Sequence, residues 1–218
     1  MKISSVQQTS FCGIPISDIS IIGSKAKYKL YNVSDRDAKF LSDMYDSVKL
    51  EKLMPNLSDL EYYLWDSILQ SAIDVSKLPL KRAFIETYNN IPCGVMCYST
   101  QGKNMHVNFV VTFPDKVSHR VPCAGQILFN ELFRRFIISD SQKIELNASR
   151  YSPFDPISKY LKLGFSMLGG DNYYEVMRIR KENVLNTLEK QKQFINVTPL
   201  YPTKEVDLSK IILLNEVV

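Results

Sequence analysis

Apolar residues recur along the chain with two different spacings, and the switches between them predict a mixed fold of helices and strands. Spacings of three or four residues predict helices over about 35–54, 58–78, 125–138 and 156–163. Alternating or β-branched and aromatic runs predict strands over 27–33, 81–88, 93–99, 104–113, 143–148, 165–168 and 173–179. The expected order of elements is therefore β-α-α-β-β-β-α-β-α-β-β.

Turn residues and the chain ends divide this pattern further. Asn89-Asn90 separates two strand-like runs, which predicts an antiparallel hairpin, and Gly164 is a favourable left-handed residue to end a helix. Residues 1–26 show no clear helical period and are interpreted as an N-terminal arm. Residues 27–180 form one predicted domain. Residues 181–218 are interpreted as a tail, with a helix to about Phe194 and then an extended stretch, that packs on the domain or on a partner chain.

Composition and charge narrow the class of protein. The 218 residues are 45% hydrophobic and 23% charged, as in an ordinary globular protein. The net charge of +4 comes from Lys and Arg spread along the whole chain, which disfavours nucleic-acid binding but suits an anionic cofactor such as a nucleotide diphosphate. The N-terminus has no signal-peptide pattern, and no apolar run approaches the roughly 20 residues of a membrane span. We therefore expect a cytoplasmic protein without a membrane partner.

The four cysteines form no metal-ligand pattern, and only two histidines accompany them. We expect Cys12, Cys93, Cys97 and Cys123 to be free thiols in a reducing compartment, and no metal site. An alternative is a nucleophilic Cys123, since a predicted helix N-terminus would stabilise its thiolate. The flanking residues resemble no cysteine-protease signature, which disfavours that alternative.

Two short motifs resemble the GNAT family of N-acetyltransferases. Arg120-Val121-Pro122-Cys123-Ala124-Gly125 leads directly into a helix and resembles the family's pyrophosphate loop, [QR]-x-x-G-x-[GA]. Arg120 and Gly125 match, whereas Cys123 stands where glycine is usual and Pro122 removes one N–H donor. The resemblance implies that this loop cradles the diphosphate of coenzyme A, with acetyl-CoA or another acyl-CoA as co-substrate and no metal.

The second motif is Tyr160-Leu161-Lys162-Leu163-Gly164-Phe165, which looks like the family's Tyr-x-x-Leu-Gly-Phe segment. By this resemblance Tyr160 lies beside the coenzyme A sulfur, where its phenol can protonate the departing thiolate. The alternative is that Tyr160 and Phe165 are core aromatic residues that close a helix.

The strand ahead of the loop carries the remaining candidates. Strict alternation places His106, Asn108, Val110 and Thr112 on one face. Many family members carry a Glu here as a base, and His106 lies at about that place; it is either the base or a hydrogen-bonded polar residue of the strand. Glu86 and Glu145 are reserve bases. The resemblance implies that the coenzyme A site is formed by Val110, Val111, Arg120, Cys123, Ala124, Gly125, Gln126 and Asn147, with a main-chain oxyanion donor near Val111.

The resemblance covers about residues 27–180 and implies an α/β (α+β) fold: a GNAT-like, mixed, mostly antiparallel central sheet flanked by helices. It implies an N-acyltransferase that moves an acyl group, typically acetyl, from coenzyme A to a primary amine of a small molecule or a protein. The alternative is a GNAT-shaped binding or structural module without turnover. The acceptor is expected to contact residues 35–75 and 89–92, with Tyr62, Tyr63 and Trp65 as candidates, and the C-terminal tail is a candidate homodimer contact.

Overall fold

The computed structural model of the chain describes residues 14–33, 58–60, 63, 66, 67, 70, 71, 74, 82–113, 120–152 and 154–200. Of the two helices expected between 35 and 78, only positions within 58–74 fall among these residues, and the described positions from 59 onwards are helical. The expected acceptor residues Tyr62 and Trp65 lie outside the described residues, whereas Tyr63 is described and exposed.

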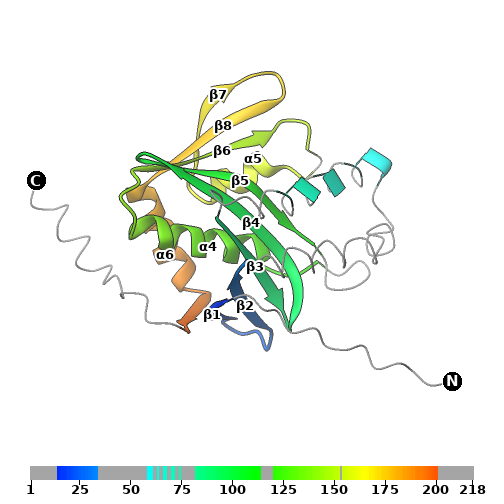
Figure 1. The fold of residues 1–218 in the computed structure, drawn as a ribbon, viewed down its shortest axis with the longest axis vertical. Helices are drawn as coiled ribbons and strands as arrows, with labels where there is room; N and C mark the ends of the chain where they lie inside the picture. Colours follow the sequence, from blue (N-terminus) through cyan, green and yellow to red (C-terminus); the bar gives the residue numbers. More distant parts are fainter. Residues whose placement is uncertain are drawn as a thin grey trace, which may run out of the picture.

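A nine-stranded sheet in the order β7-β8-β6-β5-β4-β3-β2-β1-β9 forms the body of the fold (Figure 1). Every neighbouring pair is antiparallel except β5 and β6, which are parallel. The mixed, mostly antiparallel sheet expected from the sequence is therefore confirmed. The strands are β1 (Ile14–Ile21), β2 (Lys27–Asn32), β3 (Arg82–Tyr88), β4 (Ile91–Gln101), β5 (Asn104–Thr112), β6 (Lys143–Ser149), β7 (Ser166–Gly170), β8 (Tyr174–Arg180) and β9 (Ile195–Pro199).

Local sequence signals act as expected at two connections. Asn89 and Asn90 have φ values of 49° and 69°, the left-handed pair that a tight turn between β3 and β4 requires. Gly164 has φ 91° immediately after α5 (Pro156–Lys162), where its missing Cβ permits the left-handed end of the helix.

The two chain ends correct the expected domain boundaries. β1 comes from the segment interpreted as an arm, and β9 comes from the segment interpreted as a tail. β1 pairs with both β2 and β9, so residues 14–21 and 195–199 extend the same sheet. The boundaries expected at residues 27 and 180 therefore do not mark structural breaks. The part of the tail beyond residue 200 lies outside the described residues.

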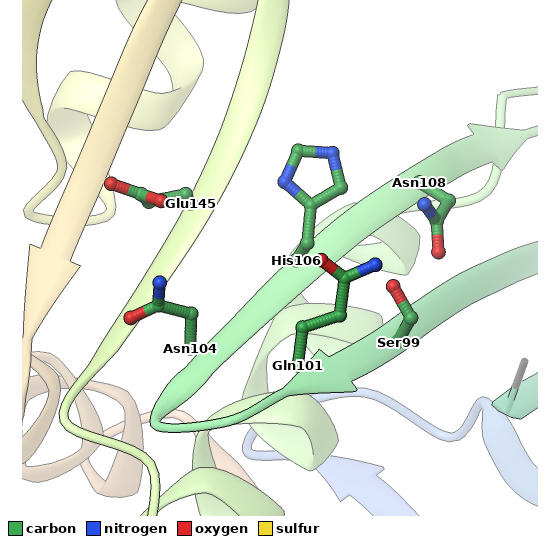
Figure 2. A pocket seen from close by; sticks show the side chains of 6 residues that line it. All are labelled: Ser99, Gln101, Asn104, His106, Asn108 and Glu145. Atoms are coloured by element: carbon green, nitrogen blue, oxygen red, sulfur yellow. The ribbon is translucent and has the colours of Figure 1, made fainter.

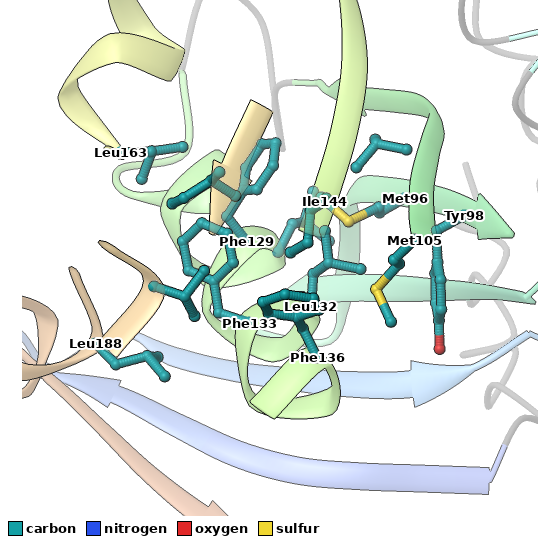
Figure 3. Packing of buried hydrophobic residues seen from close by; sticks show 14 of the residues in the cluster. Met96, Tyr98, Met105, Phe129, Leu132, Phe133, Phe136, Ile144, Leu163 and Leu188 are labelled. Carbon is teal, nitrogen blue, oxygen red and sulfur yellow. The ribbon is translucent and has the colours of Figure 1, made fainter. Parts of the chain in front are cut away.

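The core lies between the sheet and α4 (Ala124–Ile137). Phe129, Leu132, Phe133 and Phe136 of this helix pack on strand residues that include Met96 and Ile144 (Figure 3). α6 (Lys181–Lys192) adds Leu188 from the outer side of α4. Burial of such side chains is worth about 1.5–3 kcal/mol each and fixes where the first turn of α4 lies relative to the strands.

Buried polar contacts fix α6 more specifically. The side-chain amide of Asn130 donates to Gln191 Oε1 at 2.8 Å, and the hydroxyl of Thr187 donates to the carbonyl of Leu163 at 2.9 Å. These bonds join α6 to α4 and to the end of α5. The described helix of the tail thus packs on its own domain. Among the described residues, none of the helices is long and apolar enough to cross a membrane.

Candidate functional site

A β-bulge in β5 decides which side chains share a face. Cys97 of β4 pairs with Phe109 and the next residue, Tyr98, pairs with Val107, so Asn108 is an extra residue without a cross-strand partner in this ladder. Before the bulge, Met105 and Val107 pack under α4, whereas His106 and Asn108 face the opposite side.

After the bulge the alternation reverses. Val110 packs against the core under α4, and Thr112 Cγ2 lies 3.9 Å from the position that a Cβ on Gly125 would occupy. The expectation that His106, Asn108, Val110 and Thr112 share one face is therefore wrong. His106 and Asn108 face away from α4, while Val110 and Thr112 face it, because the extra residue shifts the two-residue period by one.

β5 and β6 are paired only at their beginnings. The parallel pairing ends at His106 opposite Glu145, although β5 continues to Thr112 and β6 to Ser149. Beyond that pair, β6 is held by β8 and β5 by β4. The two strands therefore diverge, and one edge of each faces the other without a shared ladder.

The pairing of β5 with β4 determines which main-chain N–H groups of β5 point towards the edge that faces β6. The N–H of Phe113 donates to the carbonyl of Cys93 at 2.9 Å, so it faces β4. In an antiparallel pair, groups that face one neighbour recur at every second residue. The N–H of Val111 therefore also faces β4, and the N–H of Val110 faces the diverging edge. The main-chain donor expected near Val111 is thus better placed on Val110.

The first turn of α4 follows at the end of this edge. Cys123 precedes the helix with φ 58° and ψ 5°, a left-handed conformation in which glycine is favoured. A left-handed residue followed by a helical one makes successive N–H groups converge, which suits an anion. The Tyr28 hydroxyl donates to the carbonyl of Pro122 at 2.9 Å and so ties the loop to β2.

The residues of this loop differ in accessibility. Ala124 is buried and Gln126 is exposed. Gly125 is half-buried, and among the described residues a Cβ there would meet Thr112 Cγ2 at 3.9 Å, an ordinary contact without overlap. The first-turn amides of a helix have no partner within the helix, so those of Ala124, Gly125 and Gln126 depend on another acceptor. The loop thus offers main-chain donors together with room for a group to approach them.

Two cations lie beside one another near this turn. Burial lowers the pKa of Lys159, the nearby guanidinium of Arg120 lowers it further, and Asp155 opposes both effects. Arg120 is exposed at the start of the loop, and Lys159 projects from α5. Repulsion between the two charges would be relieved by an anion placed between them. Sequence reasoning identified Arg120 but missed Lys159, whose place beside the loop depends on tertiary packing.

Tyr160 lies in an aromatic cluster with α4. Its ring centroid is 5.5 Å from that of Phe129 and 5.9 Å from that of Phe165. Burial raises the pKa of Tyr160 to about 12, so the phenol is protonated at neutral pH. The Tyr160 ring thus packs against the core, as the alternative interpretation expected, and the role of its hydroxyl as an acid stays a prediction.

A polar pocket of about 310 Å³ opens on the face of the sheet opposite α4. His106 lies at its centre, with Glu145 on one side and Ser99 and Asn108 on the other (Figure 2). The candidate base is thus surrounded by hydrogen-bonding groups next to the point where β5 and β6 separate. The pocket is lined by Ser99, Gln101, Asn104, His106, Asn108 and Glu145.

The sequence analysis did not identify Ser99 and Gln101 as site residues, because β4 is a largely apolar run up to Ser99. Asn147, an expected coenzyme A contact, is two residues from Glu145 on β6 and exposed on the same face, but it does not line this pocket.

The two reserve carboxylates have opposite environments. Partial burial alone would raise the pKa of Glu145, but hydrogen bonds from Arg178 and Lys143 outweigh it and hold the pKa below its usual value. Glu86 is 0% exposed beneath α4, and no N–H or O–H group of the described residues donates to either of its oxygens. Burial raises the pKa of Glu86 well above its usual value, although the Cys93 thiol lowers it somewhat. Glu145 is thus ionised and hydrogen-bonded to Lys143 and Arg178, whereas Glu86 favours its neutral form.

This environment also disfavours a cysteine nucleophile. Burial raises the pKa of the Cys123 thiol, and the neighbouring Glu86 carboxyl raises it further. The thiolate that a helix N-terminus would stabilise is therefore not favoured here. Among the described residues, Cys93, Cys97 and Cys123 form no disulfide, and no group of three or more potential metal ligands occurs.

No family model matches the sequence, and no curated protein matches it. Solved structures do match. One is an uncharacterised protein from Bacillus halodurans, with 12% identity over 83% of this chain and 97% of that chain and a TM-score of 0.57. Another is apo FdhC, described as a nucleotide-linked sugar GNAT, with 12% identity over 85% of this chain and 99% of that chain and a TM-score of 0.53. The chain therefore has the GNAT fold.

Proposed function

We propose that this protein is an acyl-CoA-dependent N-acyltransferase that transfers an acyl group, typically acetyl, to a primary amine. The observation that carries the proposal is the divergence of β5 and β6 directly after His106 and Glu145, beside the first turn of α4. This arrangement gives a thioester a place between two strand edges, with an anion-binding turn at one end and a candidate base at the other.

The residues present fit coenzyme A at the turn. Converging amides from Cys123 to Gly125 would hold the diphosphate, and the absent side chain of Gly125 leaves room for it. Arg120 and Lys159 would supply the positive charge. Pro122 contributes no N–H, but Tyr28 holds its carbonyl on the β2 side, so the loop keeps its shape without that donor.

In the proposed reaction, the acceptor amine attacks the thioester carbonyl directly. His106, or a water held by it, takes the proton that the amine loses. The N–H of Val110 stabilises the negative oxygen of the tetrahedral intermediate. When the C–S bond breaks, the Tyr160 hydroxyl gives its proton to the sulfur, so no covalent enzyme intermediate is needed.

Thermal unfolding with coenzyme A tests the first half of the proposal. At a concentration about one hundred times the Kd, a specific ligand should stabilise the fold by about 2.7 kcal/mol. Lys159→Ala should weaken this binding about tenfold, and less in high salt, because one charge-assisted contact is lost. Lys162→Ala is the matched control, because it removes an exposed lysine about one turn further along the same helix.

An acyl-transfer assay tests the second half. Absence of any shift with millimolar coenzyme A, or equal losses in the two lysine variants, would refute the proposed diphosphate site. A coenzyme A shift without transfer to any amine would instead favour the alternative of a GNAT-shaped binding module.

A further inference from the structure

The pocket around His106 contains only hydrogen-bonding side chains. Three are amides, and the others are a hydroxyl, an imidazole and a carboxyl group. Ligand pockets are usually lined mainly by apolar and aromatic groups, so this lining excludes an apolar molecule as the natural occupant. An apolar occupant would remove water from all six groups and return no hydrogen bonds.

Four of these six side chains make no hydrogen bond with the side chains or main chain of other described residues. Ser99, Gln101, Asn104 and Asn108 make no side-chain hydrogen bond with another described residue. The Asn108 Oδ1 atom is also buried from solvent, and a buried acceptor without a donor is rare in folded proteins. A ligand that donates to this atom would satisfy it.

Glu145 supplies a second acceptor and sets the charge. Its hydrogen bonds from Lys143 and Arg178 all end on Oε1, and Oε2 receives none from the described residues. Two cations already neutralise this carboxylate, so the pocket does not attract several positive charges. A polyamine is therefore disfavoured, whereas a neutral group or one amine is accepted.

Size limits the occupant further. A volume of about 310 Å³ lies at the lower end of the range of roughly 300–1,000 Å³ for ligand pockets. It corresponds to about ten water molecules at approximately 30 Å³ each. A single sugar ring or an amino alcohol of that size fills it.

We propose that this pocket binds the acceptor, and that the acceptor is a small polyhydroxylated monoamine of monosaccharide size, such as an amino sugar. The inference rests on the proposed acyltransferase function for its chemistry. Its hydroxyl groups donate to Asn108 and Glu145 and accept from the amides, while its amine lies at His106. The pocket itself can be tested without turnover.

The test measures binding of four probes by titration calorimetry, with and without saturating coenzyme A. Glucosamine carries both hydroxyls and one amine, glucose has hydroxyls only, cyclohexylamine has one amine only, and spermidine has several amines. Glucosamine should bind at least tenfold more tightly than cyclohexylamine or spermidine, with glucose between them. Equal or tighter binding of cyclohexylamine or spermidine, or no glucosamine binding in either condition, overturns the inference.

Variants assign the binding to this pocket. Gln101→Ala, at an exposed position, and Asn108→Ala should each weaken glucosamine binding at least fivefold, while coenzyme A binding stays as in wild type. Asn186→Ala, on the exposed side of α6, is the matched control and should leave both unchanged. Unchanged glucosamine binding in Gln101→Ala and Asn108→Ala overturns the assignment. Glucosamine binding without acyl transfer would contradict the acyltransferase proposal and leave the pocket inference standing.

Discussion

Replacing Glu86 with Gln should stabilise the protein at neutral pH and flatten the dependence of its stability on pH. Glu86 faces the first two turns of α4: a Cβ added at Gly94 would lie 3.4 Å from Glu86 Oε2 and 2.9 Å from Leu128 Cδ1. The groups around it are the Cys93 and Cys123 thiols and the Tyr28 phenol, none of which is a cation. Gln has the shape of the protonated carboxyl and never ionises.

The magnitude follows from linkage. Burial raises the pKa of Glu86 in the folded chain above its value in the unfolded chain. Below the unfolded value both states are protonated, so ionisation of Glu86 has no effect on stability. As the pH rises towards the folded value, only the unfolded state loses its proton, and the free energy of unfolding falls by about 1.4 kcal/mol per pH unit. This fall continues up to the pKa of Glu86 in the folded chain.

Urea unfolding of the wild type and the Glu86→Gln variant at pH 5, 6, 7 and 8 measures the effect. The advantage of the Glu86→Gln variant should be smallest at pH 5 and should grow by about 1.4 kcal/mol per unit up to the folded pKa of Glu86. Glu182→Gln, an exposed carboxyl change on α6, should keep the wild-type profile. Parallel profiles for wild type and Glu86→Gln would show that Glu86 is ionised in the folded protein, and the reasoning would be wrong.

Three further changes test other contacts. Tyr160→Phe should lower kcat at least tenfold with little change in coenzyme A affinity, measured by steady-state kinetics and calorimetry; an unchanged kcat would remove the phenol from the mechanism. Tyr28→Phe removes the hydrogen bond to Pro122 and should lower the free energy of unfolding by about 0.5–1.5 kcal/mol and weaken coenzyme A binding, whereas unaltered binding would show that this bond does not shape the loop. Asn130→Ala leaves the buried Gln191 Oε1 without its donor and should lower the free energy of unfolding by about 1–3 kcal/mol in urea, with the Asn130→Ala/Gln191→Ala double variant losing less than the sum.

The candidate site was only partly visible in the sequence. Arg120, Gly125 and Tyr160 belong to contiguous motifs next to a helix, and the chain pattern around such motifs is local. The pocket is different, because Ser99, His106 and Glu145 come from three strands and meet only through their registers. Lys159 joins Arg120 in the same way, through the packing of α5 beside the loop.

The environment of Arg135 on α4 could not be predicted from the sequence either. Arg135 lies on a helix with apolar residues at every third or fourth position, and a helical pattern alone would leave it in solvent. In the fold its guanidinium bonds Glu131 and the Tyr98 hydroxyl and lies 5.1 Å above the Phe84 ring. These partners come from its own helix and from two strands, so only packing could identify them.

The sequence by itself determined the order of strands and helices within 82–192, the Asn89-Asn90 turn and the ends of α4 and α5, because side-chain period and backbone freedom act over a few residues. Tertiary structure alone decided the bulge at Asn108, the entry of β1 and β9 into the sheet and the burial of Glu86. Each of these depends on pairing or packing between distant segments. One extra residue in a strand then reverses every side chain that follows it, which no local pattern records.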